Sequence, residues 1–214
     1  MRFETPVLLV GNGPLEGGAV ALAQAFSQTV VAADGGAAAA LRYDLPLAAV
    51  IGDMDSIAPE IVGDRAVEIA RIDDQNTTDF EKCLSEVDAP LIIGVGFLGG
   101  RLDHELAVLN TLVRLGQNVV LIGEVDMVFL LPAVFEATLP VGTRISFFPL
   151  GPVRGLESEG LTWPLKGLAL DPDGFISTSN RTATAEIAIK NPKQPILCIL
   201  PRETLGATLN RFKF

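Results

Sequence analysis

The chain has 214 residues and a mean hydropathy of +0.40, which is enough to bury a sizeable core in one large domain or two small ones. Its net charge of −10 excludes nonspecific binding to nucleic acid or to acidic membrane surfaces, because both require a basic face. No apolar run approaches the roughly 20 residues that span a bilayer, and no targeting segment is recognised. With two cysteines far apart, Cys83 and Cys198, the sequence predicts a reduced, cytoplasmic protein.

The first part of the chain alternates short apolar runs with helical patterns. Continuous Val, Ile and Leu runs separated by amphipathic helices are typical of a parallel sheet that is covered on both faces. Strands are expected at 6–13, 29–36, 47–53, 66–72, 90–96 and 118–126, and helices at 16–28, 37–44, 77–87 and 101–116. This order predicts a Rossmann-like α/β domain.

After about residue 127 the helical patterns disappear, and strands are expected between Gly and Pro turns at 127–139, 143–151, 174–191 and 195–203. Within the third of these runs one face takes Ala183, Ala185, Ile187 and Ile189, and the other takes Thr184, Glu186 and Lys190. This period of two indicates an antiparallel sheet with one wetter face. We therefore predict two domains, an α/β domain over residues 1–126 and a small all-β sandwich over residues 127–214.

Polar groups follow several strands of the expected parallel sheet. In an open parallel sheet, ligands bind beyond the carboxyl ends of the strands. A single Asp at such a position is usually a helix cap or a turn former. Because four strand ends carry polar groups, they indicate a site on one rim. These groups are Gly11-Asn12-Gly13, Asp34-Gly35-Gly36, Gly52 to Ser56, and Leu98 to His104.

Two acidic segments suggest a metal site. Asp53 and Asp55 would repel each other unless a cation lies between them, and Mg²⁺ takes carboxylate oxygens together with substrate phosphates. The alternative is that Asp55 or Ser56 caps the following turn. In the second segment Asp79 opens a helix, where the macrodipole alone accounts for an acid.

The helix that Asp79 opens carries two further features. Thr78 and Glu81 form a plausible capping box at its start. Lys82 either is solvated or reaches a phosphate. Later in the chain, Arg101 follows two glycines at a helix start, where a guanidinium and backbone N–H groups can bind phosphate. The helix that follows is expected to bury one stripe, made of Leu102, Leu106, Leu109 and Val113.

A competing motif is GxGxxG, formed by Gly94, Gly96 and Gly99. It lies between a strand and a helix, as in nicotinamide- or flavin-dependent oxidoreductases. The charged residues 101–105 crowd the turn that a pyrophosphate would have to approach, and this hypothesis leaves the aspartates unexplained. The sequence contains no GxxxxGK[ST] segment, so it does not support a P-loop kinase.

The segments DGG, GDMDSI, DQNTTDFEKCL and GGRLDHELAVLN, in this order and spacing, resemble thiamine pyrophosphokinases. In the second domain, GLTWPLKGLAL and STSN are similar to the thiamine-site segment of that family. The resemblance covers nearly the whole chain. It implies transfer of pyrophosphate from ATP to thiamine with Mg²⁺, and a homodimer with active sites at the subunit interface.

The resemblance also implies roles for individual residues. Asp53, Asp55 and Asp79 would hold the metal and, together with Arg101, carry catalysis. ATP would be contacted by Asp34, Gln75, Thr78, Lys82, Asp103 and His104. Thiamine would be contacted by Trp163, whose ring stacks on it, and by Ser179 and Asn180.

Two positions depart from the family pattern. Met54 replaces a common Phe between the two aspartates, which we interpret as a packing change. Arg181 stands where bacterial members often carry Glu, and a cation there weakens the attraction for cationic thiamine. A third hypothesis, a non-catalytic thiamine or nucleotide sensor, is disfavoured by the intact acidic set.

Overall fold

The computed structural model describes residues 1–53, 67–116 and 118–209. The chain forms two compact units, Met1–Glu124 and Val125–Phe214, whereas the sequence analysis placed the division after residue 126. We describe each unit by itself. In the described part of the chain, no helix has both the length and the apolar character to cross a membrane.

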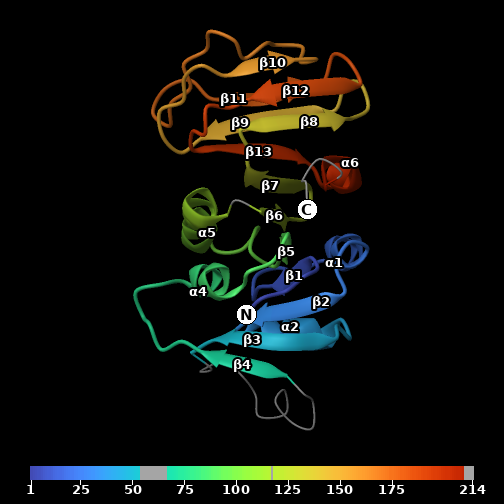
Figure 1. Cartoon of the computed structure of the whole chain (residues 1–214), viewed down its shortest axis with the longest axis vertical. Coiled ribbons are helices and arrows are strands. Elements are labelled where there is room, and N and C mark those ends of the chain that lie inside the picture. The colour runs from blue at the N-terminus through green and yellow to red at the C-terminus, as the bar shows by residue number, and fades with distance from the viewer. Residues whose placement is uncertain (54–66, 117, 210–214) are drawn as a thin grey trace. The chain divides into compact units, whose positions relative to one another are not determined.

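The first unit is an α/β domain whose strands are all parallel (Figure 1). The sheet order is β6-β5-β1-β2-β3-β4. Its strands are β1 (Val7–Val10), β2 (Thr29–Ala33), β3 (Leu47–Gly52), β4 (Glu68–Arg71), β5 (Ile92–Val95) and β6 (Val119–Ile122). Its helices are α1 (Gly17–Gln24), α2 (Gly36–Arg42), α4 (Asp79–Glu86) and α5 (Leu102–Leu115). The Rossmann-like expectation is confirmed.

The strand order reverses at β1, which pairs with β2 on one side and with β5 on the other. Because crossovers between parallel strands are right-handed, this reversal places the helices before it on one face of the sheet and the helices after it on the other. Figure 1 shows α4 and α5 on one side of the strands and α1 on the other. The carboxyl ends of the strands share one edge, and the point of reversal is where such sheets bind ligands.

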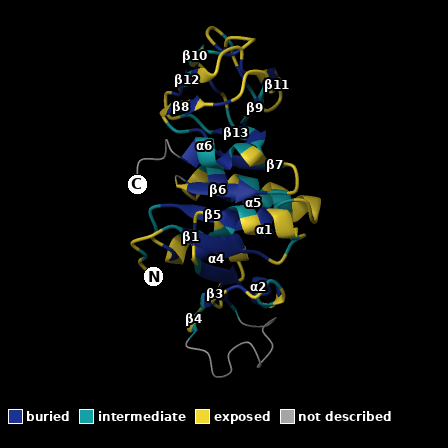
Figure 2. Cartoon of the chain, turned by 90° about the vertical axis from the view of Figure 1, so that its right-hand side faces the viewer, coloured by how far each residue is buried: buried dark blue, intermediate teal, exposed yellow. Residues whose placement is uncertain are grey.

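The core of this unit is made of the continuous apolar strands, which Figure 2 shows in the buried colour. All four residues of β1, β5 and β6 are buried, whereas β4 is an edge strand with mostly exposed residues. Helix α5 differs from expectation. Leu102 and Leu106 are 70% and 57% exposed, and the helix buries Val108, Thr111 and Leu112 instead. The expected buried stripe is therefore wrong, since Leu109 and Val113 are only half-buried and α5 packs through other residues of its later turns.

The second unit contains two antiparallel sheets. One has the order β11-β9-β13-β7 and the other β10-β12-β8. The strands are β7 (Asp126–Leu130), β8 (Val134–Thr138), β9 (Arg144–Pro149), β10 (Glu157–Glu159), β11 (Ser177–Arg181), β12 (Glu186–Lys190) and β13 (Ile196–Pro201). Phe129 of β7 packs on Phe135 of β8 with ring centroids 5.3 Å apart, so the two sheets share a core. This confirms the all-β sandwich.

Two of the strand runs expected in this unit each contain two separate strands. The run 127–139 is two strands separated at Pro132, which cannot donate to a sheet ladder. The run 174–191 contains β11 and β12, and Ile187 and Ile189 are buried as the alternation predicts. The expectation of no helix after residue 127 is wrong, because a 3₁₀ turn, η1 (Arg202–Thr204), and α6 (Leu205–Leu209) follow the last strand.

Candidate functional site

Aspartates stand directly after two neighbouring parallel strands of the first unit. Asp34 follows β2 and Asp53 follows β3, and these strands pair in parallel. Since parallel strands end at the same edge, both residues lie on the rim that the sequence analysis predicted. Asp55, the third residue expected there, lies outside the described residues.

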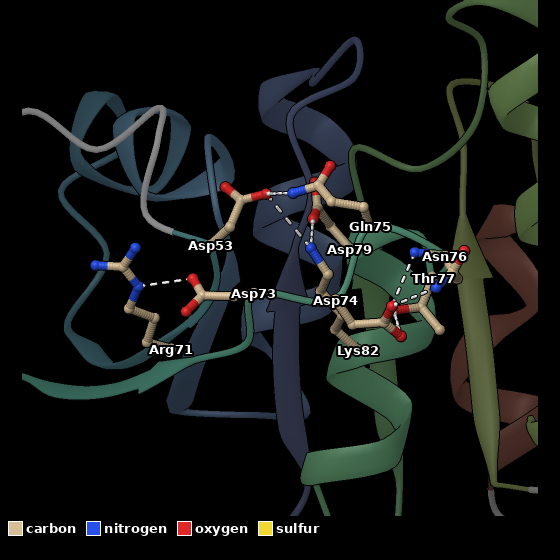
Figure 3. Close-up of polar contacts among 9 residues, drawn as sticks. All are labelled: Asp53, Arg71, Asp73, Asp74, Gln75, Asn76, Thr77, Asp79 and Lys82. Atoms are coloured by element: carbon tan, nitrogen blue, oxygen red, sulfur yellow. Dashed lines mark hydrogen bonds and ion pairs between the residues drawn. The ribbon is translucent and has the colours of Figure 1, made fainter.

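A buried lysine joins two of the predicted carboxylates (Figure 3). Nζ of Lys82 lies 3.5 Å from Oδ2 of Asp53 and 3.4 Å from Oδ1 of Asp79. The lysine side chain is only 4% exposed, against 21% for Asp53 and 48% for Asp79. The solvated interpretation of Lys82 is therefore wrong. The carboxylate that follows β3 and the carboxylate in the first turn of α4 therefore both pair with the Lys82 ammonium.

Burial alone would lower the pKa of Lys82, because it penalises the charged form. The carboxylates of Asp79 and Asp53 and their hydrogen bonds outweigh this penalty, and the pKa of Lys82 is raised. The lysine is thus held as a cation. The ammonium of Lys82 is thus a buried positive charge beside the carboxylates of Asp53 and Asp79.

The start of α4 is fixed by its cap. Oγ1 of Thr78 accepts a hydrogen bond from the backbone N–H of Glu81 at 3.2 Å, so half of the predicted capping box is confirmed. The Glu81 carboxylate accepts from Arg114 at 2.7 Å instead of completing the box. The rings of Phe80 and Phe97 lie 4.8 Å apart, which ties this first turn to the loop after β5. The position of Asp79 is therefore fixed by the cap and by the packing of the first turn of α4.

The loop before α4 is organised by Asp74, a residue that the sequence analysis did not single out. Its carboxylate accepts from the backbone N–H of Asn76 at 2.9 Å and from the hydroxyl of Thr77 at 3.1 Å, and these bonds lower the pKa of Asp74. Asp side chains often accept a hydrogen bond from the backbone N–H two residues later, which forms an Asx turn. This tendency is the signal in the sequence that could have identified Asp74. The shaped loop brings Nε2 of Gln75 to 3.5 Å from Oδ2 of Asp53 (Figure 3).

Asp34 occupies an unusual position on the rim. It is 6% exposed, has a backbone φ of +38°, and its Oδ1 has no hydrogen-bond partner among the described residues. A Cβ on Gly52 would lie 2.7 Å from the Cβ of Asp34, so only glycine allows the two strand ends to approach so closely. A buried carboxylate oxygen without a partner is costly, which marks Asp34 as a candidate for a ligand contact.

The segment at the start of α5 is more exposed. Arg101 donates to both carboxylate oxygens of Asp103, at 3.1 and 2.6 Å, and this pairing lowers the pKa of Asp103. The side chains are 70% and 65% exposed, and His104 is exposed as well. In this structure Arg101 binds a carboxylate of its own segment, not the acidic residues around Lys82.

The GxGxxG segment serves packing between strand ends. A Cβ on Gly11 would lie 2.5 Å from the carbonyl oxygen of Gly96, which also accepts from the N–H of Gly13 at 2.8 Å. The N–H of Gly99 donates to the Glu105 carboxylate at 3.1 Å. A side-chain carboxylate therefore already binds this turn, where a dinucleotide pyrophosphate would have to bind. The geometry disfavours the oxidoreductase hypothesis.

The residues predicted to contact thiamine lie in the second unit. Trp163 is 57% exposed, so its indole is accessible. Ser179 and Arg181 are exposed, whereas Asn180 is 2% exposed. The Asn180 amide binds the backbone of Trp163, accepting from its N–H at 3.2 Å and donating to its carbonyl at 2.7 Å.

The oxygen donors of the rim suit a hard divalent cation. Asp53 and Asp79 converge from different elements, and Asp34 has an acceptor that no described group uses. Within residues 1–53, 67–116 and 118–209, no group of three or more His, Cys, Asp or Glu residues is arranged to hold a metal ion. The described part of the chain therefore brings acidic oxygens together at this edge without forming a complete set of metal ligands.

Comparison with known families accounts for most of the chain. The model described as "Thiamin pyrophosphokinase, catalytic domain" matches residues 21–122, and the model described as "Thiamin pyrophosphokinase, vitamin B1 binding domain" matches residues 136–195. The chain belongs to the thiamin pyrophosphokinase family. The two matches fall in the α/β unit and in the β unit respectively.

Curated relatives carry the same family name. The chain is 34% identical over 151 residues to thiamine pyrophosphokinase 1 of Oryza sativa subsp. japonica, covering 60% of this chain and 56% of the relative. It is 29% identical over 175 residues to thiamine pyrophosphokinase 1 of Arabidopsis thaliana, covering 72% of this chain and 65% of the relative. The matches thus span less than two thirds of the length of these relatives.

Solved structures of the thiamin pyrophosphokinase family share the fold. Thiamin pyrophosphokinase from Candida albicans superposes with a TM-score of 0.77 at 19% identity, covering 94% of this chain and 92% of that one. The enzyme from Geobacillus thermodenitrificans gives a TM-score of 0.76 at 20% identity, covering 92% and 97%. At these identities the likeness establishes the fold alone.

Proposed function

We propose that the protein transfers the intact pyrophosphoryl group of ATP to the hydroxyethyl oxygen of thiamine, giving thiamine diphosphate and AMP. The observation that carries the proposal is the convergence of Asp53 and Asp79 on the buried ammonium of Lys82, at the ligand-binding edge of a family-typical α/β unit. The match of the second unit to the vitamin B1 binding model supports thiamine as the acceptor.

In the proposed reaction the thiamine hydroxyl oxygen forms a bond to the β-phosphorus of ATP. The bond between that phosphorus and the oxygen bridging it to the α-phosphate breaks, AMP leaves, and the hydroxyl proton passes to a base. Such transfers depend on alignment and charge stabilisation more than on covalent chemistry by the protein. A carboxylate of the rim, in reach of the hydroxyl, orients it or accepts its proton.

Asp53, Asp55 and Asp79 are the proposed ligands of Mg²⁺, which when bound would neutralise phosphate charge. Lys82 supplies a fixed positive charge next to the same carboxylates. Arg101 is proposed to exchange its carboxylate partner Asp103 for a phosphate, since guanidinium binds both groups in the same bidentate way.

The remaining proposed ATP contacts lie directly after β2, in the loop before α4 and in the first turn of α5. Gln75 and Thr78 flank the acidic residues, and Asp34 has an unused carboxylate oxygen that can accept from a nucleotide hydroxyl. Asp103 and His104 are exposed at the start of α5. We propose that these five side chains position ATP without taking part in bond formation.

On the thiamine side, the exposed face of Trp163 is proposed to stack on the cationic thiazolium, a cation–π contact worth about 0.5–2 kcal/mol. The Ser179 hydroxyl is a proposed polar contact to the same ligand. Arg181 is exposed beside it and is expected to reduce the affinity for the cationic ring.

We also propose a homodimer in which each thiamine lies between the carboxylates of one subunit and the indole of its partner. A reducing, cytoplasmic setting is proposed because both cysteines, Cys83 and Cys198, are free and buried. These proposals concern assembly and location and are independent of the reaction itself.

The test is a product assay with the purified protein, Mg²⁺, ATP and thiamine. Formation of AMP and thiamine diphosphate in equal amounts is the expected result. ADP with thiamine monophosphate would indicate transfer of a single phosphoryl group and would overturn the proposal. Omission of thiamine should abolish AMP formation, which separates transfer from ATP hydrolysis.

A further inference from the structure

Asn180 binds the backbone of Trp163 at both of its polar groups. Its Oδ1 accepts from the N–H of Trp163 at 3.2 Å and from the N–H of Arg181 at 2.8 Å, and its Nδ2 donates to the carbonyl of Trp163 at 2.7 Å. The side chain is buried at 2% exposure. One amide thus holds a residue 17 positions away in the sequence.

A distortion of β11 turns Asn180 inward. The pairing of β11 with β9 shifts register between Ser177 and Asn180, and Ser179 has a backbone φ of +58° with its N–H donating to Oγ of Ser146 at 3.0 Å. In a regular strand Ser177 and Ser179 would face the same side. Here Ser177 and Asn180 are buried while Ser179 is exposed, as a bulge allows.

The segment around Trp163 is held by contacts of its main chain. Leu161 forms a bridge with Thr182, and the N–H of Thr162 donates to the carbonyl of Arg181 at 2.8 Å. Trp163 as a residue is 57% exposed, so less than half of its surface is covered by packing. The Asn180 amide is the contact that fixes the peptide from which this ring projects.

We propose that Asn180 is a positioning residue that fixes the orientation of Trp163 and does not itself contact the ligand. The resemblance to the family implied a contact between Asn180 and thiamine, but both ends of its amide bind protein backbone and the residue is buried. That the ligand ring stacked on Trp163 is the thiazolium of thiamine rests on the proposed function. The positioning role stands on the hydrogen bonds alone.

Trp163 is the single tryptophan of the chain, so its fluorescence reports on this site directly. In the ligand-free protein, Asn180→Ala should lower the anisotropy of tryptophan emission and increase quenching by acrylamide. Asn180→Asp keeps the acceptor but replaces the donor with an oxygen that faces the Trp163 carbonyl, and should act in the same direction. If Asn180→Ala does not fold, the isosteric Asn180→Asp carries the test.

Asn191 provides a matched control. It is a buried Asn of the same unit, 3% exposed, whose side chain donates to the carbonyls of Leu131 and Gln194 and accepts from the N–H of Gln194. Asn191→Asp should lower the melting temperature but leave the anisotropy and quenching of Trp163 unchanged. Unchanged fluorescence in a folded Asn180 variant, or an equal change in Asn191→Asp, would overturn the proposal.

Kinetics distinguish positioning from direct contact. Asn180→Asp should raise the thiamine KM by about tenfold, the order expected for a lost hydrogen bond, with the ATP KM unchanged. A raised thiamine KM with unaltered fluorescence would mean that Asn180 contacts the ligand directly, against the proposal. If the wild-type protein does not turn over thiamine, the proposed function fails, whereas the fluorescence result still decides the role of Asn180.

Discussion

The ammonium of Lys82 lies 3.5 Å from a carboxylate oxygen of Asp53, although one residue belongs to helix α4 and the other follows strand β3. Asp79 reaches the same ammonium at 3.4 Å. The lysine therefore balances the charge of two acids that the proposed mechanism assigns to magnesium. Their roles can be separated by replacing each group in turn.

Asp53→Asn or Asp79→Asn should reduce kcat/KM by about a thousandfold, because each removes a proposed metal ligand from the site of phosphoryl charge. Rates measured across a magnesium titration provide the check. Asp73→Asn is the matched control. Asp73 lies in the loop between β4 and α4, but its carboxylate pairs with Arg71 at 2.7 Å and its side chain is 69% exposed. Near wild-type turnover at low magnesium in either site variant would remove that residue from the metal site.

The Lys82 ion pairs should make stability depend on alkaline pH. Because the pKa of Lys82 is raised above its ordinary value of 10.5, the pairs contribute fully below that value, and the contribution is lost as pH rises through the raised pKa. The stability difference between wild type and Lys82→Met should therefore stay constant from about pH 8 to about pH 10 and shrink above the ordinary value of 10.5, toward about pH 12.

Denaturant unfolding at each pH gives this difference. Arg71→Met serves as the comparison, because the Arg71–Asp73 pair is exposed and arginine does not titrate in this range. Its difference from wild type should be small and constant. A constant gap for Lys82→Met up to about pH 12 would show that the ion pairs of Lys82 do not stabilise the fold.

Gly96→Ala should destabilise the protein more than Gly99→Ala. Both glycines have positive φ, +74° and +81°, which costs alanine about 1–2 kcal/mol. At Gly96 the added Cβ would also lie 2.7 Å from the carbonyl oxygen of Gly11, whereas at Gly99 nothing lies within 4 Å. We expect a loss of about 3 kcal/mol or more in unfolding free energy for Gly96→Ala. Equal losses in urea melts would contradict the packing role.

Trp163→Ala should raise the thiamine KM by about tenfold through loss of the cation–π contact, with little change in the ATP KM. Steady-state kinetics with each substrate varied in turn measures the two constants. Phe175→Ala is the control, because Phe175 is an equally exposed aromatic residue of the same unit, at 57%. An equal rise in both KM values for Trp163→Ala would indicate general damage to the protein.

Mixed dimers test the proposed sharing of the site between subunits. Co-expression of Trp163→Ala and Asp79→Asn chains with different tags should yield heterodimers in which one of the two sites carries neither substitution. Their activity should exceed the sum of the two homodimeric variants. No gain in purified heterodimers would mean that Trp163 acts within its own subunit, leaving the proposed reaction unaffected.

The parallel α/β unit, the antiparallel β unit and the aspartates at the strand ends can all be predicted from the sequence alone. These features rest on local patterns, since a continuous apolar run such as that of β1 specifies a strand buried on both faces wherever it is placed. The cap formed by Thr78 is equally local, because its donor lies three residues away. The family resemblance rests on such segments and needs no long-range information.

The surroundings of individual side chains could not be predicted from the sequence, because they depend on how the chain packs in three dimensions. Lysine is usually exposed, yet Lys82 is buried, because Asp53 after β3 and Asp79 of its own helix supply two carboxylates that pair with its ammonium. Leu102 fits an apolar stripe but is exposed, because α5 packs through its later turns. Asn180 faces inward because a bulge shifts the register of β11. The contact between Lys82 and Asp53 and the pairing of β11 with β9 join segments that are distant in sequence, so local periodicity does not predict them.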